Sequence, residues 1–257
     1  MKVLITGGGG FIGKNLTEGL NEYDVTSITR DDFDLTDTNS VNKFFKGKNF
    51  DVVIHTAIIG GDRMVIDSDK TLTQNLLLFN NLMDNESHFK KLINFGSGAE
   101  THSPNSPYGI SKKIISDNVS KNEGFYNIVI FATFNENELN SRFIKANMLN
   151  YINKKPMIIH RNKYMDFFYM TDLITLVKFY LNNNVLPKSI DCSYQKKVTL
   201  KDIADMINNL SDYKVPIIIE ESGLDKSYIG NDLFLKDLSL NLIGLEEGIR
   251  RTYISYK

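Results

Sequence analysis

Tyr108 and Lys112 are the two side chains in this sequence whose types and spacing best suit proton transfer. They lie four residues apart in PYGISKK, a segment that can begin a helix after Pro107. Residues at this spacing share one helix face. A lysine ammonium beside a phenol favours the phenolate, so it lowers the tyrosine pKa from its usual value of about 10. Such a tyrosine can act as an acid or a base near neutral pH, although the same spacing also arises by chance on solvated helices.

Ser97 precedes this pair and directly follows an apolar segment, residues 92–95, that we interpret as a strand. In open α/β sheets, ligands bind at the carboxyl ends of the strands. A serine hydroxyl at that edge can donate a hydrogen bond to a carbonyl oxygen or to the tyrosine oxygen. Ser97, Tyr108 and Lys112 are therefore the predicted catalytic residues.

Glycines at the start of the chain indicate a nucleotide cofactor. Gly7, Gly10 and Gly13 have GxxGxxG spacing, after an apolar strand (residues 3–6) and at the start of a helix. The first glycine allows a tight turn, the second lets a pyrophosphate approach the backbone, and the third lets helix and strand pack closely. The helix N-terminus adds unpaired amides. The alternative interpretation is a flexible turn in an ordinary α/β protein.

The residue after the second strand favours NADP(H) over NAD(H). An acidic side chain at this place binds a ribose 2′-hydroxyl, whereas a basic one suits a 2′-phosphate. This strand ends in SITRDDFDL, with Arg30 at that place. The alternative is that Arg30 pairs with Asp31 or Asp32. Asp34 and Leu35 are expected to lie against the adenine.

Alternation of short apolar runs with amphipathic segments predicts the fold class: α/β, a Rossmann-type doubly wound parallel sheet with a small interwoven α/β lobe that binds substrate. The predicted strands are residues 3–6, 25–29, 52–55, 92–95 and 127–131. Two helices are predicted from apolar residues that recur at helical spacing. Their inward-facing residues are Ile12, Leu16 and Leu20 in the first helix and Leu72, Leu76, Phe79 and Met83 in the second.

The second half is less regular, and we divide the chain into a nucleotide-binding domain (residues 1–133 and 166–188) and a substrate lobe (residues 134–165 and 189–257). A helix is expected after Ser141, with Phe143, Ile144, Met148 and Ile152 inward. Two more helices are expected to begin at caps, Thr171–Asp172 and Thr199. A final amphipathic helix is predicted over Leu245–Tyr256.

Composition limits the class of protein. The 257 residues are 42% hydrophobic, enough for a sizeable core, and 30 Lys and Arg balance 31 Asp and Glu. This near-neutral net charge does not indicate a basic surface for binding nucleic acid. The single cysteine, Cys192, excludes an internal disulfide, and no metal site is expected. No signal-peptide pattern or membrane-length apolar run is present, so we expect a cytoplasmic protein.

The chain resembles the extended short-chain dehydrogenase/reductases, in their nucleotide-sugar epimerase/dehydratase/reductase branch. The resemblance runs from end to end, and within the branch it is greatest to the GDP-fucose synthase-like 4-keto reductases. The matching residues are TGGGGFIG at 6–13, HTA at 55–57, Asn75, Asn81, Ser97, YGISK at 108–112, DFFYMTDL at 166–173 and LEEGIRRT at 245–252.

This resemblance implies an enzyme that uses NADP(H), or less readily NAD(H), on a nucleotide sugar, and that forms a homodimer through segments 76–83 and 114–119. It implies that His55 is a packed, hydrogen-bonded histidine. Basic residues are expected to meet the substrate diphosphate, although each alone could equally be solvated; they are Arg142, Lys145 and His160. The implied cofactor contacts are Gly7, Gly10, Phe11, Ile12, Gly13, Arg30, Asp34, Leu35, Thr56, Ala57, Asn75, Tyr108 and Lys112.

Departures from the family pattern narrow the expected reaction. Ala99 replaces the cysteine that serves C3/C5 epimerisation in GDP-fucose synthase, and FATFNENELNSRF at 131–143 lacks its histidine. The acid pair of the dehydratases is absent after Ser97, and Glu100 stands one step beyond it. Hydride transfer to a keto sugar remains, most simply at C4. The alternatives are an NAD-dependent UDP-hexose-type 4-epimerase and a non-catalytic NAD(P)-sensing protein on the same fold.

Overall fold

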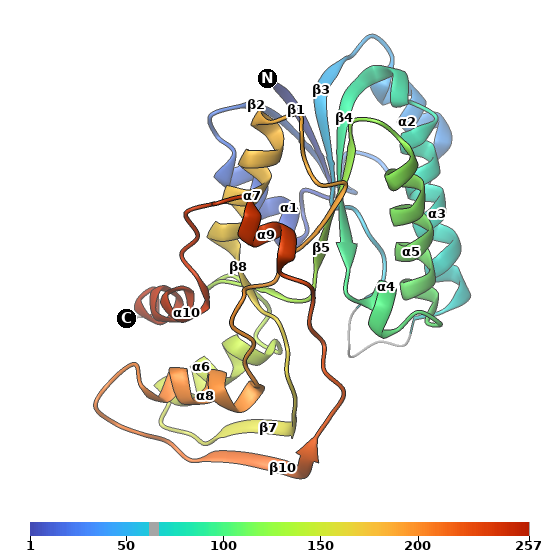
Figure 1. The fold of residues 1–257 in the computed structure, drawn as a ribbon. Coiled ribbons are helices and arrows are strands. Elements are labelled where there is room, and N and C mark those ends of the chain that lie inside the picture. Colours follow the sequence, from blue (N-terminus) through green and yellow to red (C-terminus); the bar gives the residue numbers. More distant parts are fainter. Residues whose placement is uncertain (62–66, 257) are drawn as a thin grey trace. The chain divides into compact units, whose positions relative to one another are not determined.

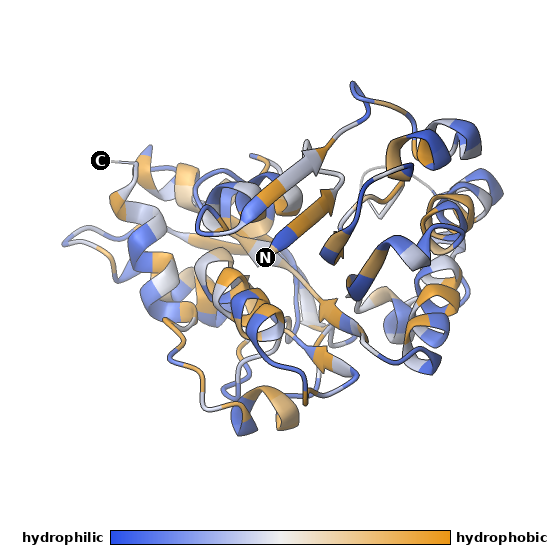
Figure 2. Cartoon of the chain, turned by 90° about the horizontal axis from the view of Figure 1, so that it is seen from above, coloured by the Kyte–Doolittle hydropathy of each residue, from blue (hydrophilic) through white to orange (hydrophobic). Residues whose placement is uncertain are grey.

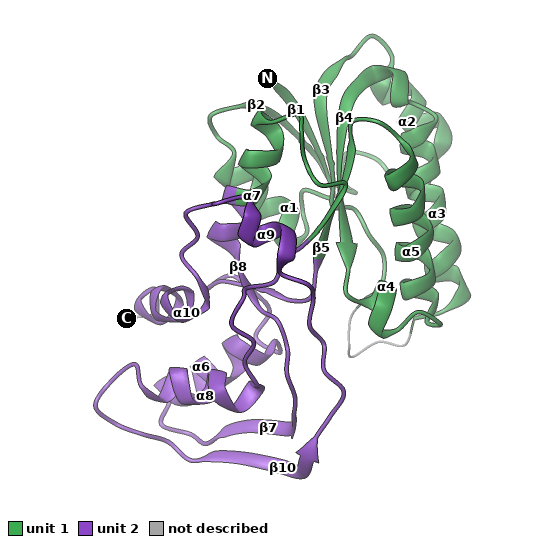
Figure 3. Cartoon of the chain, viewed as in Figure 1, with its two compact units in different colours: residues 1–129, 176–190 green, residues 130–175, 191–257 purple. Residues whose placement is uncertain are grey.

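The computed structural model describes residues 1–61 and 67–256, which form two compact units (Figure 3). The first unit contains residues 1–129 and 176–190. The second contains residues 130–175 and the chain from Asp191 onward. Within the described part of the chain, no helix combines the length and the apolar character needed to cross a bilayer.

A six-stranded sheet forms the centre of the first unit, in the order β2-β1-β3-β4-β5-β9. Strand β1 pairs in parallel with β2 and β3, and β3 pairs in parallel with β4 (Figure 1). The predicted Rossmann-type α/β class is therefore confirmed. The strands are β1 (Lys2–Thr6), β2 (Asp24–Ile28), β3 (Phe50–His55), β4 (Phe89–Ser97), β5 (Phe125–Ile130) and β9 (Ser189–Asp191).

Helices cover both faces of this sheet, with α2, α3 and α5 on one side and α1 and α7 on the other (Figure 1). This explains why the strands are continuous apolar runs rather than alternating ones, because a strand between two helical layers has no solvated face. Figure 2 shows the strands as mainly hydrophobic and the helices as mixed. The helices are α1 (Phe11–Gly19), α2 (Thr38–Phe45), α3 (Asp69–Met83), α4 (Ala99–His102), α5 (Pro107–Lys121), α7 (Met170–Asn182) and a short 3-10 turn (Glu86–His88).

The predicted inward face of α3 is confirmed in part: Phe79 is buried, and Leu76 and Met83 are partly buried and pack against the same core. Leu72 is only partly buried, and the buried side chains of α3 also include the amides Asn75 and Asn81. These two amides bind backbone groups of neighbouring segments, at Ile59 and Leu35 respectively. Satisfying buried polar groups turns the amide-bearing face inward, and apolar spacing alone does not reveal this.

The second unit is built around a hydrophobic core that includes Phe134, Tyr151, Phe167 and Ile203. The unit contains two parallel strand pairs, β7 with β10 and β6 with β8. Helices α6, α8 and α10 contribute side chains to the same core. Thr199 forms a capping box with Asp202 at the start of α8, as predicted. The elements are β6 (Thr133–Phe134), α6 (Phe143–Ile152), β7 (Met157–Asn162), β8 (Phe168–Tyr169), α8 (Leu200–Asn208), β10 (Ile217–Leu224), α9 (Leu233–Asp237) and α10 (Leu245–Ile254).

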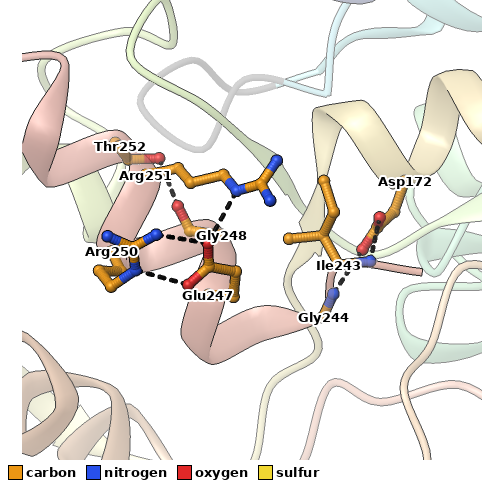
Figure 4. Close-up of polar contacts among 8 residues, drawn as sticks. All are labelled: Asp172, Ile243, Gly244, Glu247, Gly248, Arg250, Arg251 and Thr252. Atoms are coloured by element: carbon orange, nitrogen blue, oxygen red, sulfur yellow. Dashed lines mark hydrogen bonds and ion pairs between the residues drawn. The ribbon is translucent and has the colours of Figure 1, made fainter. Parts of the chain in front are cut away.

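Asp172 does not cap α7, because that helix begins two residues earlier at Met170. Its fully buried carboxylate instead accepts the backbone N–H groups of Ile243 and Gly244 at 2.7 and 2.9 Å (Figure 4). It also accepts the hydroxyl of Tyr194. These bonds fix the backbone immediately before α10. Asp172 is therefore a long-range anchor, because its two backbone partners lie about 70 residues away.

A buried lysine secures the end of α7 in the first unit. Lys91 of β4 is 9% exposed, and its Nζ donates to the carbonyl oxygens of Tyr180 at 2.8 Å and Asn183 at 2.7 Å. The last carbonyls of a helix have no partner within the helix, and they carry partial negative charge. Lys91 satisfies them, and burial lowers its pKa.

Replacing Lys91 by Met should lower the free energy of unfolding by about 2 kcal/mol, because two or more helix-end carbonyls would lose their partner in a buried position. The matched control is Lys90→Met, which removes an exposed ion pair with Asp51 and should cost less than about 1 kcal/mol. Denaturant unfolding curves of both variants measure the difference. Equal midpoints for the two variants would show that Lys91 does not anchor α7.

Candidate active site

The turn between β1 and α1 requires glycine for reasons that lie within the chain at two positions. Gly7 has φ +74°, and a Cβ there would lie 2.6 Å from the backbone nitrogen of Ala57. At Gly13, a Cβ would lie 2.3 Å from the carbonyl oxygen of Gly7. Both are closer than real Cβ atoms come, so only glycine lets α1 approach the ends of β1 and β3.

Gly10 differs, because the chain itself leaves room there. A Cβ at Gly10 would meet only the carbonyl oxygen of Gly7, at 3.4 Å. Gly10 is the N-cap of α1, and no side chain caps this helix. The amides of the first turn, at Phe11 and Ile12, thus face the same open edge. This arrangement fits a phosphate, because an uncapped helix N-terminus favours an anion and a glycine lets it approach the backbone.

The end of β3 lies against this turn. Thr56 donates its hydroxyl to the carbonyl oxygen of Thr6 at 2.7 Å, and Ala57 supplies the backbone that Gly7 contacts. His55 is buried, and its Nδ1 lies 2.8 Å from the hydroxyl oxygen of Thr6. Burial, with the nearby charge of Lys112, lowers the pKa of His55 to about 3, so its imidazole is neutral at pH 7. His55 is therefore a packed, hydrogen-bonded residue, as expected.

Asn75 holds the segment that follows β3. It is fully buried, and its side chain accepts from the N–H of Ile59 at 2.8 Å and donates to the carbonyl of Ile59 at 2.9 Å and to Ser111 at 3.1 Å. The amide thus binds the chain itself, between α3 and α5. These bonds give Asn75 a structural role within the chain, whereas the family resemblance implies a contact with the cofactor.

Tyr108 and Lys112 lie in the first two turns of α5, which begins at Pro107. Ser106 caps this helix by accepting the N–H of Gly109 at 3.0 Å. The ammonium of Lys112 lies 5.7 Å from the centroid of the Tyr108 ring and donates to the carbonyl oxygen of Phe95 at 2.6 Å. The predicted sharing of one helix face is therefore confirmed.

Lys112 is almost fully buried, and this burial lowers its pKa to about 8, while the negative charge of Glu100 acts in the opposite direction. The ammonium is therefore charged at neutral pH and loses its proton as the pH rises through about 8. A buried lysine with a strongly shifted pKa is typical of functional sites.

Ser97 is the last residue of β4 and is 9% exposed. Its hydroxyl oxygen accepts the N–H of Ala99 at 3.2 Å, which leaves the hydroxyl proton available to another acceptor. Its own backbone N–H donates to the Glu100 carboxylate at 2.8 Å. The structure thus brings Ser97, Tyr108 and Lys112 to neighbouring segments, the end of β4 and the start of α5.

Gly61, which was not predicted as a site residue, packs against Tyr108, the predicted catalytic tyrosine. It has φ +73°, and a Cβ there would lie 2.7 Å from Cζ of Tyr108. The sequence signal was the pair of adjacent glycines at 60 and 61, shortly after HTA, because paired glycines mark backbone that other residues cannot adopt. Both have positive φ in the structure. A side chain at Gly61 would displace the phenol ring.

The loop after β2 leaves Arg30 exposed. Asp32 accepts the N–H and the hydroxyl of Thr29 at 2.8 and 3.0 Å, and no ion pair joins Arg30 to Asp31 or Asp32 in this described segment. Hydrogen bonds from Thr36 hold the pKa of Asp34 below its usual range, with a smaller effect of Arg30.

Leu35 lies mainly in the hydrophobic core of the first unit, beside Val41 and Phe45. Its side chain is 8% exposed, so little of it is available to an adenine. Leu35 packs in the core because it lies at the end of the loop, just before α2, whose Val41 and Phe45 belong to the same core.

The predicted substrate contacts separate into two groups. Arg142 is the N-cap of α6, and Lys145 donates to the carbonyl oxygen of Glu136 at 2.7 Å. The buried carboxyl group of Glu138 accepts the backbone N–H of Lys145. Burial raises the pKa of Glu138 to about 8, and the charges of Arg142 and Lys145 act in the opposite direction. His160 instead lies on the exposed strand β7, within 3.1 and 3.3 Å of Glu220 and Glu221. Two neighbouring carboxylates make it a poor phosphate ligand.

Comparison with known proteins supports the resemblance. Residues 3–192 match the model of the "NAD dependent epimerase/dehydratase family". A GDP-L-colitose synthase from Yersinia pseudotuberculosis is 23% identical over an alignment of 298 residues, with coverage of 98% of this chain and 96% of that protein.

Two solved structures show the same fold. The GDP-mannoheptose C4 reductase MlghC from Campylobacter jejuni, with NADP bound, has a TM-score of 0.83 at 19% identity, covering 99% of this chain and 98% of that one. A UDP-glucose 4-epimerase from Thermus thermophilus, in complex with NAD, has a TM-score of 0.78 at 18% identity, covering 100% and 99%. The family model matches well over half of the residues, so this chain belongs to the NAD dependent epimerase/dehydratase family.

Proposed function

We propose that this protein is an NADPH-dependent reductase that converts a 4-keto group of a nucleotide-linked (deoxy) sugar to a hydroxyl. The observation that carries the proposal is the grouping of Ser97, Tyr108 and Lys112 beside the glycine turn, with the buried Ala99 where a proton-transferring side chain would stand. Alanine moves no proton, so this grouping supports hydride transfer without epimerisation. The relatives whose names describe GDP-sugar reduction or synthesis add support for the sugar class.

Each residue has one task in the proposed reaction. The bound cofactor supplies the hydride to the keto carbon. The hydroxyl of Ser97, already accepting from Ala99, donates a hydrogen bond to the keto oxygen. Tyr108 gives its proton to that oxygen as negative charge develops. The Lys112 ammonium stabilises the resulting phenolate.

The preference for NADPH rests on Arg30. Its guanidinium is exposed beside the loop after β2, while Asp32 is occupied by Thr29. A planar guanidinium can bind a 2′-phosphate with two parallel hydrogen bonds. The 4-epimerase alternative, with permanently bound NAD, would require an acidic group free to bind the ribose.

For the second unit, we propose that Arg142 and Lys145 bind the substrate diphosphate. They lie at the N-cap and in the first turn of α6, and the charges of both act on the buried Glu138. We do not assign His160 to this site, because of its carboxylate neighbours. The predicted homodimer remains a proposal; Leu77 of α3 and Ile114 of α5 are its exposed apolar residues.

The experiment that tests the proposed function is NADPH oxidation with a panel of 4-keto-6-deoxy sugars on GDP, dTDP, CDP and UDP, with NADH in parallel. Turnover with one nucleotide and a preference for NADPH is the expected result. Epimerisation of UDP-hexoses with bound NAD, without net NADPH oxidation, would contradict the proposal. Tight cofactor binding without turnover of any sugar would favour the non-catalytic sensor.

Replacing Tyr108 by Phe should reduce kcat by roughly 10²- to 10⁴-fold, because the general acid is lost. The Kd for NADPH, measured by fluorescence, should change less than about threefold, since the ring and Lys112 remain. The control is Tyr23→Phe, which removes a hydroxyl on the same unit that binds only Asn182 among the described contacts. Unchanged kcat in Tyr108→Phe would show that another group supplies the proton.

Replacing Arg30 by Ser should weaken NADPH binding by roughly 10- to 100-fold, the range for a lost charge-assisted hydrogen bond. NADH binding should stay within about twofold, because NADH has no 2′-phosphate. Isothermal titration with both cofactors measures the two effects, and Lys46→Ser, an exposed cation on the same unit, is the control. An equal loss for both cofactors would mean that Arg30 does not recognise the 2′-phosphate.

A further inference from the structure

Glu100 is a charged group just after β4 that the reaction does not use directly. It lies in the short helix α4, three residues after Ser97 and one position beyond the place where family dehydratases have their acid pair. One carboxylate oxygen accepts the backbone N–H of Ser97 at 2.8 Å. Burial raises the pKa of Glu100, whereas this bond and the nearby polar side chains of Ser116 and Asn127 favour the ionised form.

The surrounding elements are shaped to hold this carboxylate. A Cβ at Gly96 would lie 2.5 Å from Oε1 of Glu100 and 2.6 Å from Nδ2 of Asn127, so glycine is required for both side chains to fit. Asn127 of β5 donates to Ser116 of α5 at 3.0 Å and accepts from Asn94 of β4 at 2.7 Å. A polar chain thus links β4, β5 and α5 beneath the site, and Glu100 is its only charged member among the described residues.

The same carboxylate lies one residue along β4 from the group that binds the ammonium of Lys112: its Oε1 lies against Gly96, and Lys112 donates to the carbonyl oxygen of the preceding residue, Phe95, at 2.6 Å. Lys112 is one helical turn before Ser116 on α5, and Glu100 is the negative group that acts on its ammonium. The other titratable groups near Lys112 are His55 of β3, which is neutral, and Tyr108 of α5. A buried ammonium without a counter-charge gives up its proton, because burial disfavours the charged form.

We propose that Glu100 is a positioning residue of this site, which holds the backbone of Ser97 and provides the counter-charge of Lys112. One carboxylate thereby connects two of the catalytic groups: it fixes the turn that carries the serine hydroxyl and keeps the lysine protonated. Its effect on catalysis rests on the proposed function; its effect on Lys112 does not.

The sign of the effect follows from the charges. Burial lowers the pKa of Lys112 to about 8, and Glu100 opposes that change. Burial raises the pKa of Glu100, while its hydrogen bonds and the lysine favour its ionised form. Removing the negative charge should therefore lower the pKa of Lys112 further, by about 1 to 3 units for an opposite charge at close range. The lysine would then be largely neutral at pH 7.

The direct test is the titration of Lys112 in the Glu100→Gln protein, followed by NMR of lysine labelled with ¹³C at Cε. The Lys112 resonance is identified by its absence in Lys112→Met. In Glu100→Gln, the titration midpoint of Lys112 should fall from about 8 by at least one unit. In the control Glu18→Gln it should stay at the wild-type value. In Glu100→Asp, which restores the negative charge, it should return most of the way to that value. This measurement requires neither cofactor nor substrate. An unchanged midpoint in Glu100→Gln, or equal midpoints in the Gln and Asp variants, overturns the proposal.

The catalytic consequence is read from the pH profile of NADPH-dependent reduction. In the wild type, kcat/KM should fall as the pH rises through about 8, and in Glu100→Gln this fall should occur at lower pH by the same amount as the NMR midpoint. A merely structural role would lower the rate equally at every pH. If no sugar is reduced but the NMR midpoint moves, the proposed function fails and this inference stands. If a sugar is reduced but the pH profiles of the wild type and Glu100→Gln coincide, the proposed function stands and this inference fails.

Discussion

The site depends on burying a lysine ammonium at the carboxyl end of a parallel strand. Lys112 can keep its charge there only if that charge is compensated; its ammonium donates to the carbonyl oxygen of Phe95, and the negative charge of Glu100 is the counter-charge that we propose. The position of the serine follows from the same arrangement, because Glu100 also accepts the N–H of Ser97. The glycines at 61 and 96 provide the room that these groups need.

The first unit explains why the reactive groups meet. Parallel strands bring their carboxyl ends to one edge, so the glycine turn after β1, the HTA segment after β3 and Ser97 at the end of β4 are neighbours although they are far apart in sequence. Helix α5 then adds Tyr108 and Lys112 from its first two turns. In the second unit, the buried Asp172 anchors the backbone before α10.

Features that depend on local pattern were predictable from the sequence. The strands, the glycine turn, the Thr199 cap and the shared face of Tyr108 and Lys112 follow from periodicity and short-range chemistry. Features that depend on distant partners were not. Two buried amides on the inward side of α3 bind other segments, and Asp172 binds backbone groups about 70 residues away rather than its own helix. The role of Glu100 is visible only once β5 and α5 lie beside it, and His160 acquires its carboxylate neighbours only through the pairing of β7 with β10.

The most direct test of the proposed reduction is the fate of the hydride. The protein is incubated with NADPH deuterated at the transferable position of C4 and with the 4-keto sugar nucleotide that supports turnover, and the product is examined by mass spectrometry and NMR. The account predicts one deuterium at sugar carbon 4 and one NADP⁺ formed for each product molecule. A product without deuterium, or a C4 epimer formed without net loss of NADPH, would contradict it.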